Sequence, residues 1–204
     1  MKLEPFICQD GVEIYKTVVG PIDNNVFVIR CSDTGDSLLI DAANEQNKLI
    51  DISRELNVKT IVETHGHWDH IGAVDQLRLQ GYSVGVTEGD AKMLPSYDYL
   101  IEDGQIIGIG KLRFRAIKTP GHTPGSVCFL LEDHHILFSG DTLFPGGPGA
   151  TKFEGGDFPT IINSIESRLF KELGPGTLVL PGHGSSTTIG NELPHLDEWI
   201  KRGW

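Results

Sequence analysis

The sequence has few cysteines, and no pattern joins them. Cys8, Cys31 and Cys128 are the only three in 204 residues, they are widely spaced, and no C-x-x-C pair occurs. Thiol redox motifs and cysteine-based structural zinc motifs are therefore absent. Cys31 and Cys128 lie in apolar runs, which predicts that both are buried, reduced thiols.

Positive charge is scarce as well. The chain has 17 lysines and arginines against 28 aspartates and glutamates, which gives a formal net charge of −11. Nucleic acids and anionic membrane surfaces are both bound by basic faces, so this balance argues against either as a partner. An anionic small substrate remains compatible with it, because bound divalent cations invert the local field.

Long apolar runs are the third absence. No segment approaches the roughly 18 apolar residues of a membrane-spanning helix. The N-terminal stretch MKLEPFICQDG lacks the apolar centre of a signal peptide, so we expect a cytoplasmic protein. The hydrophobic share of 39% and the length are those of a globular chain with a full core. We expect residues 1–204 to form a single domain.

Apolar periodicity predicts strands and helices that follow one another along the chain. In the first half the predicted strands are 12–19, 25–31, 37–41, 60–65 and 82–87, and the predicted helices are 45–57 and 69–81. In the second half they are strands 105–110, 112–119, 125–133, 135–141 and 177–184, and helices 158–176 and 195–204. Asp69 is the candidate N-cap of helix 69–81. This order indicates an α/β fold in which two sheets pack face to face with helices outside.

Three histidines and an aspartate gather in the stretch ETHGHWDHIGAV, just after a predicted strand. His65 and His67 are two positions apart, so they point the same way in an extended segment. Asp69 and His70 follow as the chain turns into the next helix, and can face a second point nearby. The spacing therefore favours two adjacent metal ions over one.

Three more candidate ligands follow other predicted strands. His122 lies in TPGHTPGS, Asp141 in FSGDTLF and His183 in LPGHGSS, each beside a glycine. Imidazole and carboxylate groups are natural ligands for zinc and its first-row neighbours. The remaining histidines, His134, His135 and His195, are interpreted as turn residues.

Together the stretches THGHWDH, GHTPGS, SGDTLF and PGHG resemble the metallo-β-lactamase-fold hydrolases, and within them the glyoxalase II group (hydroxyacylglutathione hydrolases). The resemblance runs from about residue 20 to residue 185 and implies the four-layer αββα sandwich. It also implies a dinuclear site of two divalent ions, with zinc expected and iron or manganese as alternatives. The implied roles are His65, His67 and His122 on the first ion, Asp69, His70 and His183 on the second, Asp141 bridging both, and Asp41 supporting the site from behind.

The resemblance further implies hydrolysis of a small-molecule thioester to an acid and a thiol. A water shared by two cations has its pKa lowered from about 15.7 toward 7, and the resulting hydroxide would be the nucleophile. Asp69 is the candidate catalytic residue that orients this hydroxide and moves its proton.

Two departures from glyoxalase II concern the thiol carrier. That group has a C-terminal helical domain that contacts glutathione, and only 21 residues follow His183 here, so we expect this domain to be lacking. The glycine-rich loop 142–158 also differs, with Pro148 where the group has cysteine. Lys152 and Phe153 in this loop are candidate substrate contacts, and glutathione is not assumed to be the carrier.

Other functions stay open on the same motifs. One is a different dinuclear-zinc hydrolase, such as a lactonase or phosphodiester enzyme. Another is a persulfide dioxygenase with a single iron, although its loop after the bridging aspartate differs from TLFPGG. A non-enzymatic binding module is disfavoured by the complete set of seven ligands. β-Lactam hydrolysis is disfavoured because no cysteine falls in a ligand motif, and ribonuclease activity because the chain is acidic. The acyl group and the oligomeric state are left open.

Overall fold

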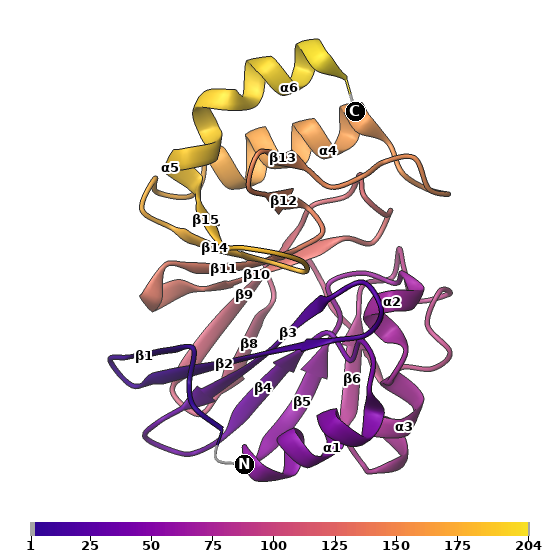
Figure 1. Cartoon of the computed structure of the whole chain (residues 1–204), viewed down its shortest axis with the longest axis vertical. Helices are drawn as coiled ribbons and strands as arrows, with labels where there is room; N and C mark the ends of the chain where they lie inside the picture. Colours follow the sequence, from indigo (N-terminus) through magenta and orange to yellow (C-terminus); the bar gives the residue numbers. More distant parts are fainter. Residues whose placement is uncertain (1–2, 204) are drawn as a thin grey trace.

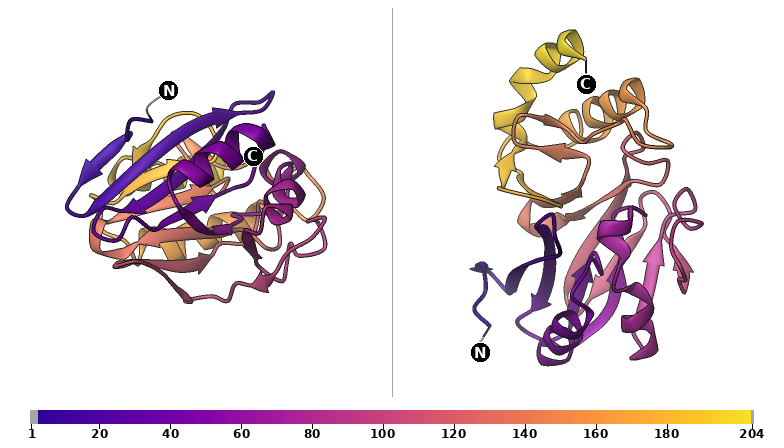
Figure 2. Two further views of the ribbon diagram at one scale, coloured as in Figure 1. Left: turned by 90° about the horizontal axis from the view of Figure 1, so that it is seen from below. Right: turned by 45° about the vertical axis from the view of Figure 1, so that its right-hand side comes forward.

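The computed structural model describes residues 3–203. Its elements form four layers, with two β-sheets packed face to face and helices on the outer face of each sheet (Figure 1). The right-hand view in Figure 2 shows the same stacking, with the first half of the chain on one side and the second half on the other. This is the αββα arrangement expected from the sequence.

The first sheet and its helices come from the first half of the chain. The seven strands, in sheet order, are β1 (Ile7–Gln9), β2 (Val12–Val19), β3 (Asn24–Cys31), β4 (Ser37–Ile40), β5 (Val58–Val62), β6 (Ser83–Val86) and β7 (Tyr99–Leu100). The helices are α1 (Gln46–Glu55), α2 (Trp68–Ile71) and α3 (Val74–Leu79). Strands β4 to β7 are parallel, so their carboxyl ends lie at one edge of the sheet.

The second sheet and its helices come from the second half. Its six strands, in sheet order, are β15 (Thr187–Thr188), β14 (Leu178–Pro181), β11 (Ile136–Gly140), β10 (Val127–Leu131), β9 (Leu112–Lys118) and β8 (Ile106–Ile109). Its helical segments are α4 (Phe158–Ser164), the π-helix η2 (Ile165–Phe170), α5 (Ile189–Glu192) and α6 (Leu196–Arg202), with 3₁₀ turns η1 (Glu132–His134) and η3 (Leu193–His195). In Figure 1, α4 and α6 lie at the top, and α1 and α3 at the bottom.

Alternation along the strands divides the apolar side chains among three cores. In β3, Val26 and Val28 pack toward α1 and α3, whereas Phe27 and Ile29 face the second sheet. Successive side chains of a strand point to opposite faces, so each strand with both faces covered reads as a continuous apolar run. Cys128 of β10 packs in the third core, under α4 and α6.

Helix 69–81 is the main departure from the predicted elements, because it is broken in two. The helix α2 ends at Ile71 and α3 begins at Val74. Between them, a Cβ at Gly72 would lie 2.6 Å from the carbonyl oxygen of Ala43. The N–H of Ala73 donates to Ala42 at 2.8 Å instead of continuing a helical ladder. Contact with the loop before α1 thus overrides the local helical pattern.

The ends of several predicted elements also differ from those in the structure. Asp69 is not an N-cap, because it lies inside α2, whose N-cap is His67. The helix predicted over 158–176 starts where expected, with Asp157 accepting the N–H of Thr160, but its helical part ends at Phe170. Loop 142–158 contains a short hairpin of β12 (Leu143–Phe144) and β13 (Gly147–Pro148). The predicted last helix reaches Arg202, and its final residue, Trp204, lies outside the described residues.

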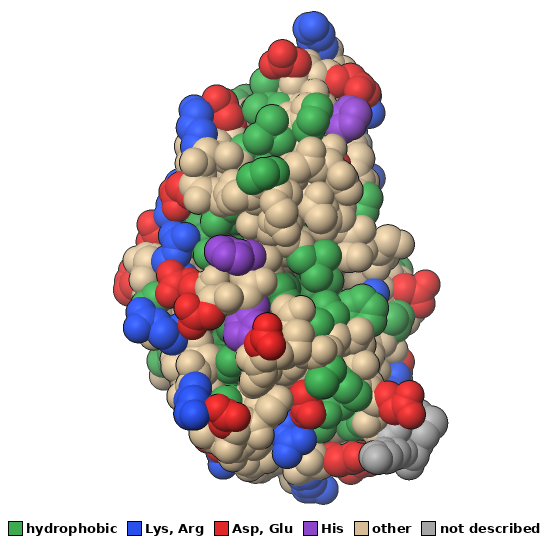
Figure 3. Space-filling view, turned by 90° about the vertical axis from the view of Figure 1, so that its left-hand side faces the viewer, with side chains coloured by type: hydrophobic (Ala, Val, Ile, Leu, Met, Phe, Trp, Pro, Cys, Tyr) green, Lys and Arg blue, Asp and Glu red, His purple; other side chains and the backbone are tan. Residues whose placement is uncertain are grey.

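The cysteines, the apolar character of the helices and the surface charge bear on the remaining expectations. Cys31 and Cys128 are both buried free thiols, as predicted. Within residues 3–203, no helix has both the length and the apolar character needed to cross a bilayer. On the face shown in Figure 3, acidic and basic side chains are interspersed instead of gathering into one basic surface.

Candidate metal centre

All seven candidate ligands converge at one edge of the sandwich. His65, His67, Asp69 and His70 follow β5, His122 lies in the turn between β9 and β10, Asp141 follows β11, and His183 follows β14. Strands β11 and β14 are parallel, and β10 is antiparallel to β11, so the end of β11, the end of β14 and the start of β10 meet at the same edge. The folding of both sheets, not sequence proximity, brings the last three residues to the first four.

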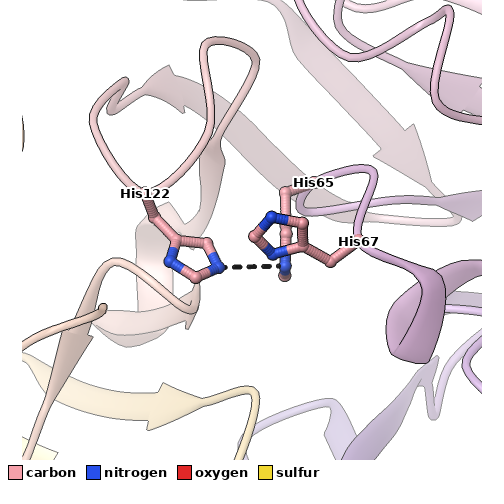
Figure 4. Close-up of side chains that lie close together, drawn as sticks. All are labelled: His65, His67 and His122. Atoms are coloured by element: carbon pink, nitrogen blue, oxygen red, sulfur yellow. Dashed lines mark hydrogen bonds between the residues drawn. The ribbon is translucent and has the colours of Figure 1, made fainter. Parts of the chain in front are cut away.

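The ligand atoms form two neighbouring groups. The imidazole side consists of His65, His67 and His122, and the carboxylate side consists of Asp69, His70 and His183; within each group the atoms lie within 4.8 Å of one another. Figure 4 shows the imidazole side, with His65 and His67 on one loop facing His122 on another. Asp141 lies between the sides, with Oδ2 3.6 Å from Nε2 of His122 and Oδ1 3.5 Å from Nε2 of His70.

Distances within each side match the spacing of ligands around one small cation. Two ligands at about 2.0–2.1 Å from a tetrahedral zinc ion are about 3.3–3.4 Å apart. On the imidazole side, the Nε2 atoms of His65 and His122 are 3.3 Å apart. On the carboxylate side, the Nε2 atoms of His70 and His183 are also 3.3 Å apart, and Asp69 Oδ2 is 3.3 Å from His183 Nε2.

Hydrogen bonds at the far side of the rings turn the ligand nitrogens inward. Nδ1 of His122 lies 2.6 Å from the carbonyl oxygen of Ala150, and Nδ1 of His183 lies 3.0 Å from that of Ile22. A carbonyl oxygen only accepts, so each Nδ1 carries the donated proton and each Nε2 is left for a ligand.

Asp41, fully buried at the end of β4, orients two more rings. Its Oδ2 accepts from Nδ1 of His70 at 2.8 Å and from the hydroxyl of Thr64 at 2.9 Å, and that hydroxyl contacts Nδ1 of His65 at 3.1 Å. The backbone of Asp41 has a φ of +65°, a left-handed conformation that costs a residue with a side chain roughly 1–2 kcal/mol. A single carboxylate therefore holds His70 directly and His65 through Thr64.

Asp90, which the sequence analysis missed, ties together the loops of the imidazole side. It is 0% exposed, and its carboxylate accepts from the N–H of Gly66 at 2.8 Å, the N–H of Gly125 at 2.7 Å and the hydroxyl of Thr123 at 2.6 Å. A Cβ at Gly125 would lie 2.5 Å from the Asp90 carboxylate, so glycine is needed there. In the sequence, an aspartate in TEGDAK is an ordinary turn residue, so no local signal distinguishes it.

Asn24 was also missed, although the sequence carried a signal for it. Its Nδ2 donates to Oδ2 of Asp69 at 2.7 Å, and its side chain is buried at the start of β3. Asparagine is depleted in strands, so the pair Asn24 and Asn25 at the head of an apolar strand was unusual. Asn25 holds the loop of His183, because it donates to the carbonyl oxygens of Pro181 and Gly184.

Charges differ between the two sides in the metal-free chain. Burial, reinforced by the neighbouring imidazoles, holds the pKa of His65 well below its usual value. Burial also lowers the pKa of His70, but the carboxylates of Asp141 and Asp41 outweigh it, so this pKa is raised well above the usual value. The pKa of Asp69 is lowered, since hydrogen bonds from His183 and His70 overcome the effect of burial.

The residues present fit a pair of divalent cations. Oδ1 of Asp141 is buried and has no hydrogen-bond partner, which is costly unless a cation satisfies it. A Cβ at Gly182 would lie 2.4 Å from that oxygen, so the glycine before His183 keeps space open beside it. Imidazole and carboxylate donors at these spacings suit zinc and other first-row ions.

A cavity of about 530 Å³ opens over the cluster, and it is called the mouth of the metal centre below. The lining residues are Ile22, His67, Trp68, Asp69, Met93, His122, Asp141, Phe153, Glu154 and His183. Of the two candidate substrate contacts, Phe153 lines this mouth, whereas Lys152 is not among the lining residues and places its ammonium 5.5 Å from the Phe153 ring centroid. His134 and His195 lie elsewhere, in the turns η1 and η3.

Comparisons with known proteins identify the family of the chain. Residues 19–183 match the family model of the metallo-beta-lactamase superfamily. The chain is 36% identical over 193 residues to the hydroxyacylglutathione hydrolase GloC of Haemophilus influenzae, covering 81% of this chain and 90% of that protein.

Two solved structures are similar over most of their length. The B3 metallo-beta-lactamase BLEG-1 has a TM-score of 0.80 and 31% identity, covering 89% of this chain and 97% of that one. TTHA1623, in a di-iron-bound form, has a TM-score of 0.78 and 29% identity, covering 88% and 96%. The chain therefore belongs to the metallo-β-lactamase superfamily, and its histidine and aspartate cluster is that of a metal-dependent hydrolase.

Proposed function

We propose that the chain hydrolyses thioesters to an acid and a thiol, using two divalent cations. The observation that supports this most is the pair of ligand groups that meet at Asp141, whose two oxygens face His122 and His70. The similarity to GloC, named a hydroxyacylglutathione hydrolase, supports the thioester as the bond attacked.

Each side of the centre would hold one cation. His65, His67 and His122 would bind the first, Asp69, His70 and His183 the second, and Asp141 both. When bound, the two cations would polarise the substrate carbonyl and lower the pKa of water toward 7. Zinc is the expected metal, and iron is an alternative because TTHA1623 has been solved with two irons.

Asp69 is the candidate proton acceptor. Its Oδ2 receives the hydrogen bond from Asn24 and contacts His70 and His183, which leaves Oδ1 as the oxygen available for a proton. The pKa of Asp69 is lowered, so the carboxylate is ionised at neutral pH and has an oxygen free of its own proton. Asn24 would fix the direction of this carboxylate.

Water is the nucleophile in this proposal. Among the described residues that line the mouth there is no serine, threonine or cysteine. The oxygen of water forms a bond to the carbonyl carbon and one proton passes to Asp69. The carbon–sulfur bond breaks, sulfur leaves with the electron pair as a thiolate, and the proton then passes from Asp69 to this thiolate, which becomes the thiol. A thiolate is a weak base, so its departure needs little assistance.

Elemental analysis, together with hydrolysis of S-D-lactoylglutathione and simpler thioesters, tests this function. We expect two metal ions per chain and turnover that is lost on chelation. Asp69→Asn should lower kcat by about 10²-fold or more, the scale of a general base. Two zinc ions with turnover of lactones but of no thioester would overturn the thioester assignment. A single iron with oxygen uptake on persulfides would overturn the hydrolase mechanism.

A further inference from the structure

Four apolar side chains form a rim around the mouth of the metal centre. This apolar rim consists of Ile22, Trp68, Met93 and Phe153. The side chains come from four separate segments of the chain, and they are 48%, 63%, 39% and 51% exposed respectively. A gathering of exposed apolar side chains around a polar cavity marks a ligand-binding surface.

The rim lies directly against the ligand loops. The ring of Phe153 meets the ring of His67 edge-on at 5.5 Å between centroids. A Cβ at Gly66 would lie 2.6 Å from Cβ of Met93, so Met93 packs on the backbone between His65 and His67. Trp68 begins α2 immediately after His67. A group bonded to a carbon reacting at the centre would therefore meet these side chains first.

The charges of the mouth disfavour an anionic carrier. Among the described residues lining it, the only charged side chain besides the candidate ligands is Glu154, and no lysine or arginine is present. A carrier with two carboxylates, such as glutathione, would find no lysine or arginine among these lining side chains, and the carboxylate of Glu154 would oppose it at a distance from the cations of the centre. The neighbouring Lys152 directs its ammonium toward the ring of Phe153.

We propose that the apolar rim binds the acyl group of the substrate, and that this group is an apolar chain or ring carried on an uncharged thiol. The acyl substituent and the sulfur are both bonded to the reacting carbon, and the acyl group is the one assigned to Phe153 and Met93 because an apolar group matches these apolar side chains. This inference rests on the proposed thioesterase function. It predicts that the length of the acyl chain sets the specificity, with Trp68 as a main determinant.

The test uses the zinc-loaded protein with S-acyl-N-acetylcysteamine thioesters of two, four, six and eight acyl carbons. Each buried methylene should raise kcat/KM by about twofold to fourfold. The same acyl groups on glutathione should be hydrolysed more slowly. Trp68→Ala should flatten the dependence on chain length. Leu79→Ala, an apolar side chain on α3 that is 74% exposed and away from the mouth, is the matched control and should leave the dependence unchanged.

Calorimetric binding of acetate and octanoate separates this inference from the thioesterase proposal. Octanoate should bind the zinc-loaded protein more than tenfold more tightly than acetate, and Trp68→Ala should remove that preference. Equal rates for all chain lengths, or faster hydrolysis on glutathione, would overturn the rim assignment while the thioesterase stands. A preference for octanoate that depends on Trp68, without hydrolysis of any thioester, would support the rim and overturn the thioesterase.

Discussion

On the carboxylate side of the centre, Asp41 touches a ligand ring itself, whereas on the imidazole side Asp90 touches only the chain around the ligands. Asp41 accepts from Nδ1 of His70 at 2.8 Å. Asp90 accepts from the backbone N–H of Gly66, which lies between His65 and His67, and from the hydroxyl of Thr123 and the N–H of Gly125, which follow His122. Direct contact sets the orientation and basicity of one ring, while backbone contact sets the distance between two loops.

The two sides also differ in how readily their histidines are protonated when no metal is bound. His70 and His183 have raised pKa values because carboxylates of Asp69, Asp141 and Asp41 surround them. His65 and His67 have lowered pKa values because burial and neighbouring imidazoles disfavour their charged forms. In the chain without metal, protonation is therefore favoured at His70 and His183 and disfavoured at His65 and His67.

Removing the residue that the two sides share should have the largest effect. Asp141→Asn keeps the shape but removes the negative charge between the sides, so we expect kcat/KM to fall by about 10³-fold, equivalent to about 4 kcal/mol. Metal content should fall below two ions per chain. Kinetics and elemental analysis check this; activity near that of the unmodified chain with two ions bound would contradict the shared position of Asp141.

Asp41→Asn and Asp90→Asn compare the two kinds of support. Asp41→Asn should weaken zinc binding about 10–100-fold, because a ring N–H loses a charged acceptor. Asp90→Asn should act mainly on stability, by about 1–3 kcal/mol, since three buried donors then share one amide oxygen. Chelator competition measures zinc affinity, and urea unfolding of the metal-free chain measures stability.

Asp98→Asn is the matched control for this pair. Asp98 accepts from Arg78 at 2.6 Å on the surface, far from any ligand, so zinc affinity should not change and stability should change by no more than about 1 kcal/mol. If Asp90→Asn weakened zinc binding as strongly as Asp41→Asn and left stability intact, the distinction between ring support and loop support would be wrong.

The pH dependence of metal loading should give the most selective difference between the two sides. Cations must displace the protons of His70 and His183, so affinity on the carboxylate side should rise with pH, by up to about tenfold per unit for each proton, until the raised pKa values are passed. On the imidazole side, the pKa values of His65 and His67 are lowered, so these two rings should contribute little change over the same range. Cobalt titrations at about pH 6 and about pH 8 measure both.

Variants that lack one ligand on one side allow the cobalt titration to report on the other side alone. His122→Ala leaves the carboxylate side to be titrated alone, and His183→Ala leaves the imidazole side. Equal pH dependence in the two variants would show that the sides do not differ in proton occupancy.

Local patterns were sufficient for much of the fold. Val26 to Ile29 form a continuous apolar run, and β3 is buried on both faces as such a run predicts. The stretch from His65 to His70 placed four ligand-type side chains within six residues, and the structure brings them within reach of His122, Asp141 and His183. The break of helix 69–81 at Gly72 was missed, because its cause is contact with Ala43.

The sequence by itself determined the strand pattern, the glycine-flanked loops and the identity of the seven candidate ligands, because these depend on residue type and spacing along the chain. Only the tertiary structure decided that Asp90 and Asn24 support the centre and that Trp68, Met93, Phe153 and Ile22 share one mouth. Those relationships join segments far apart in sequence, and an aspartate in a turn or a tryptophan on a short helix takes its role from what the folded chain places opposite it.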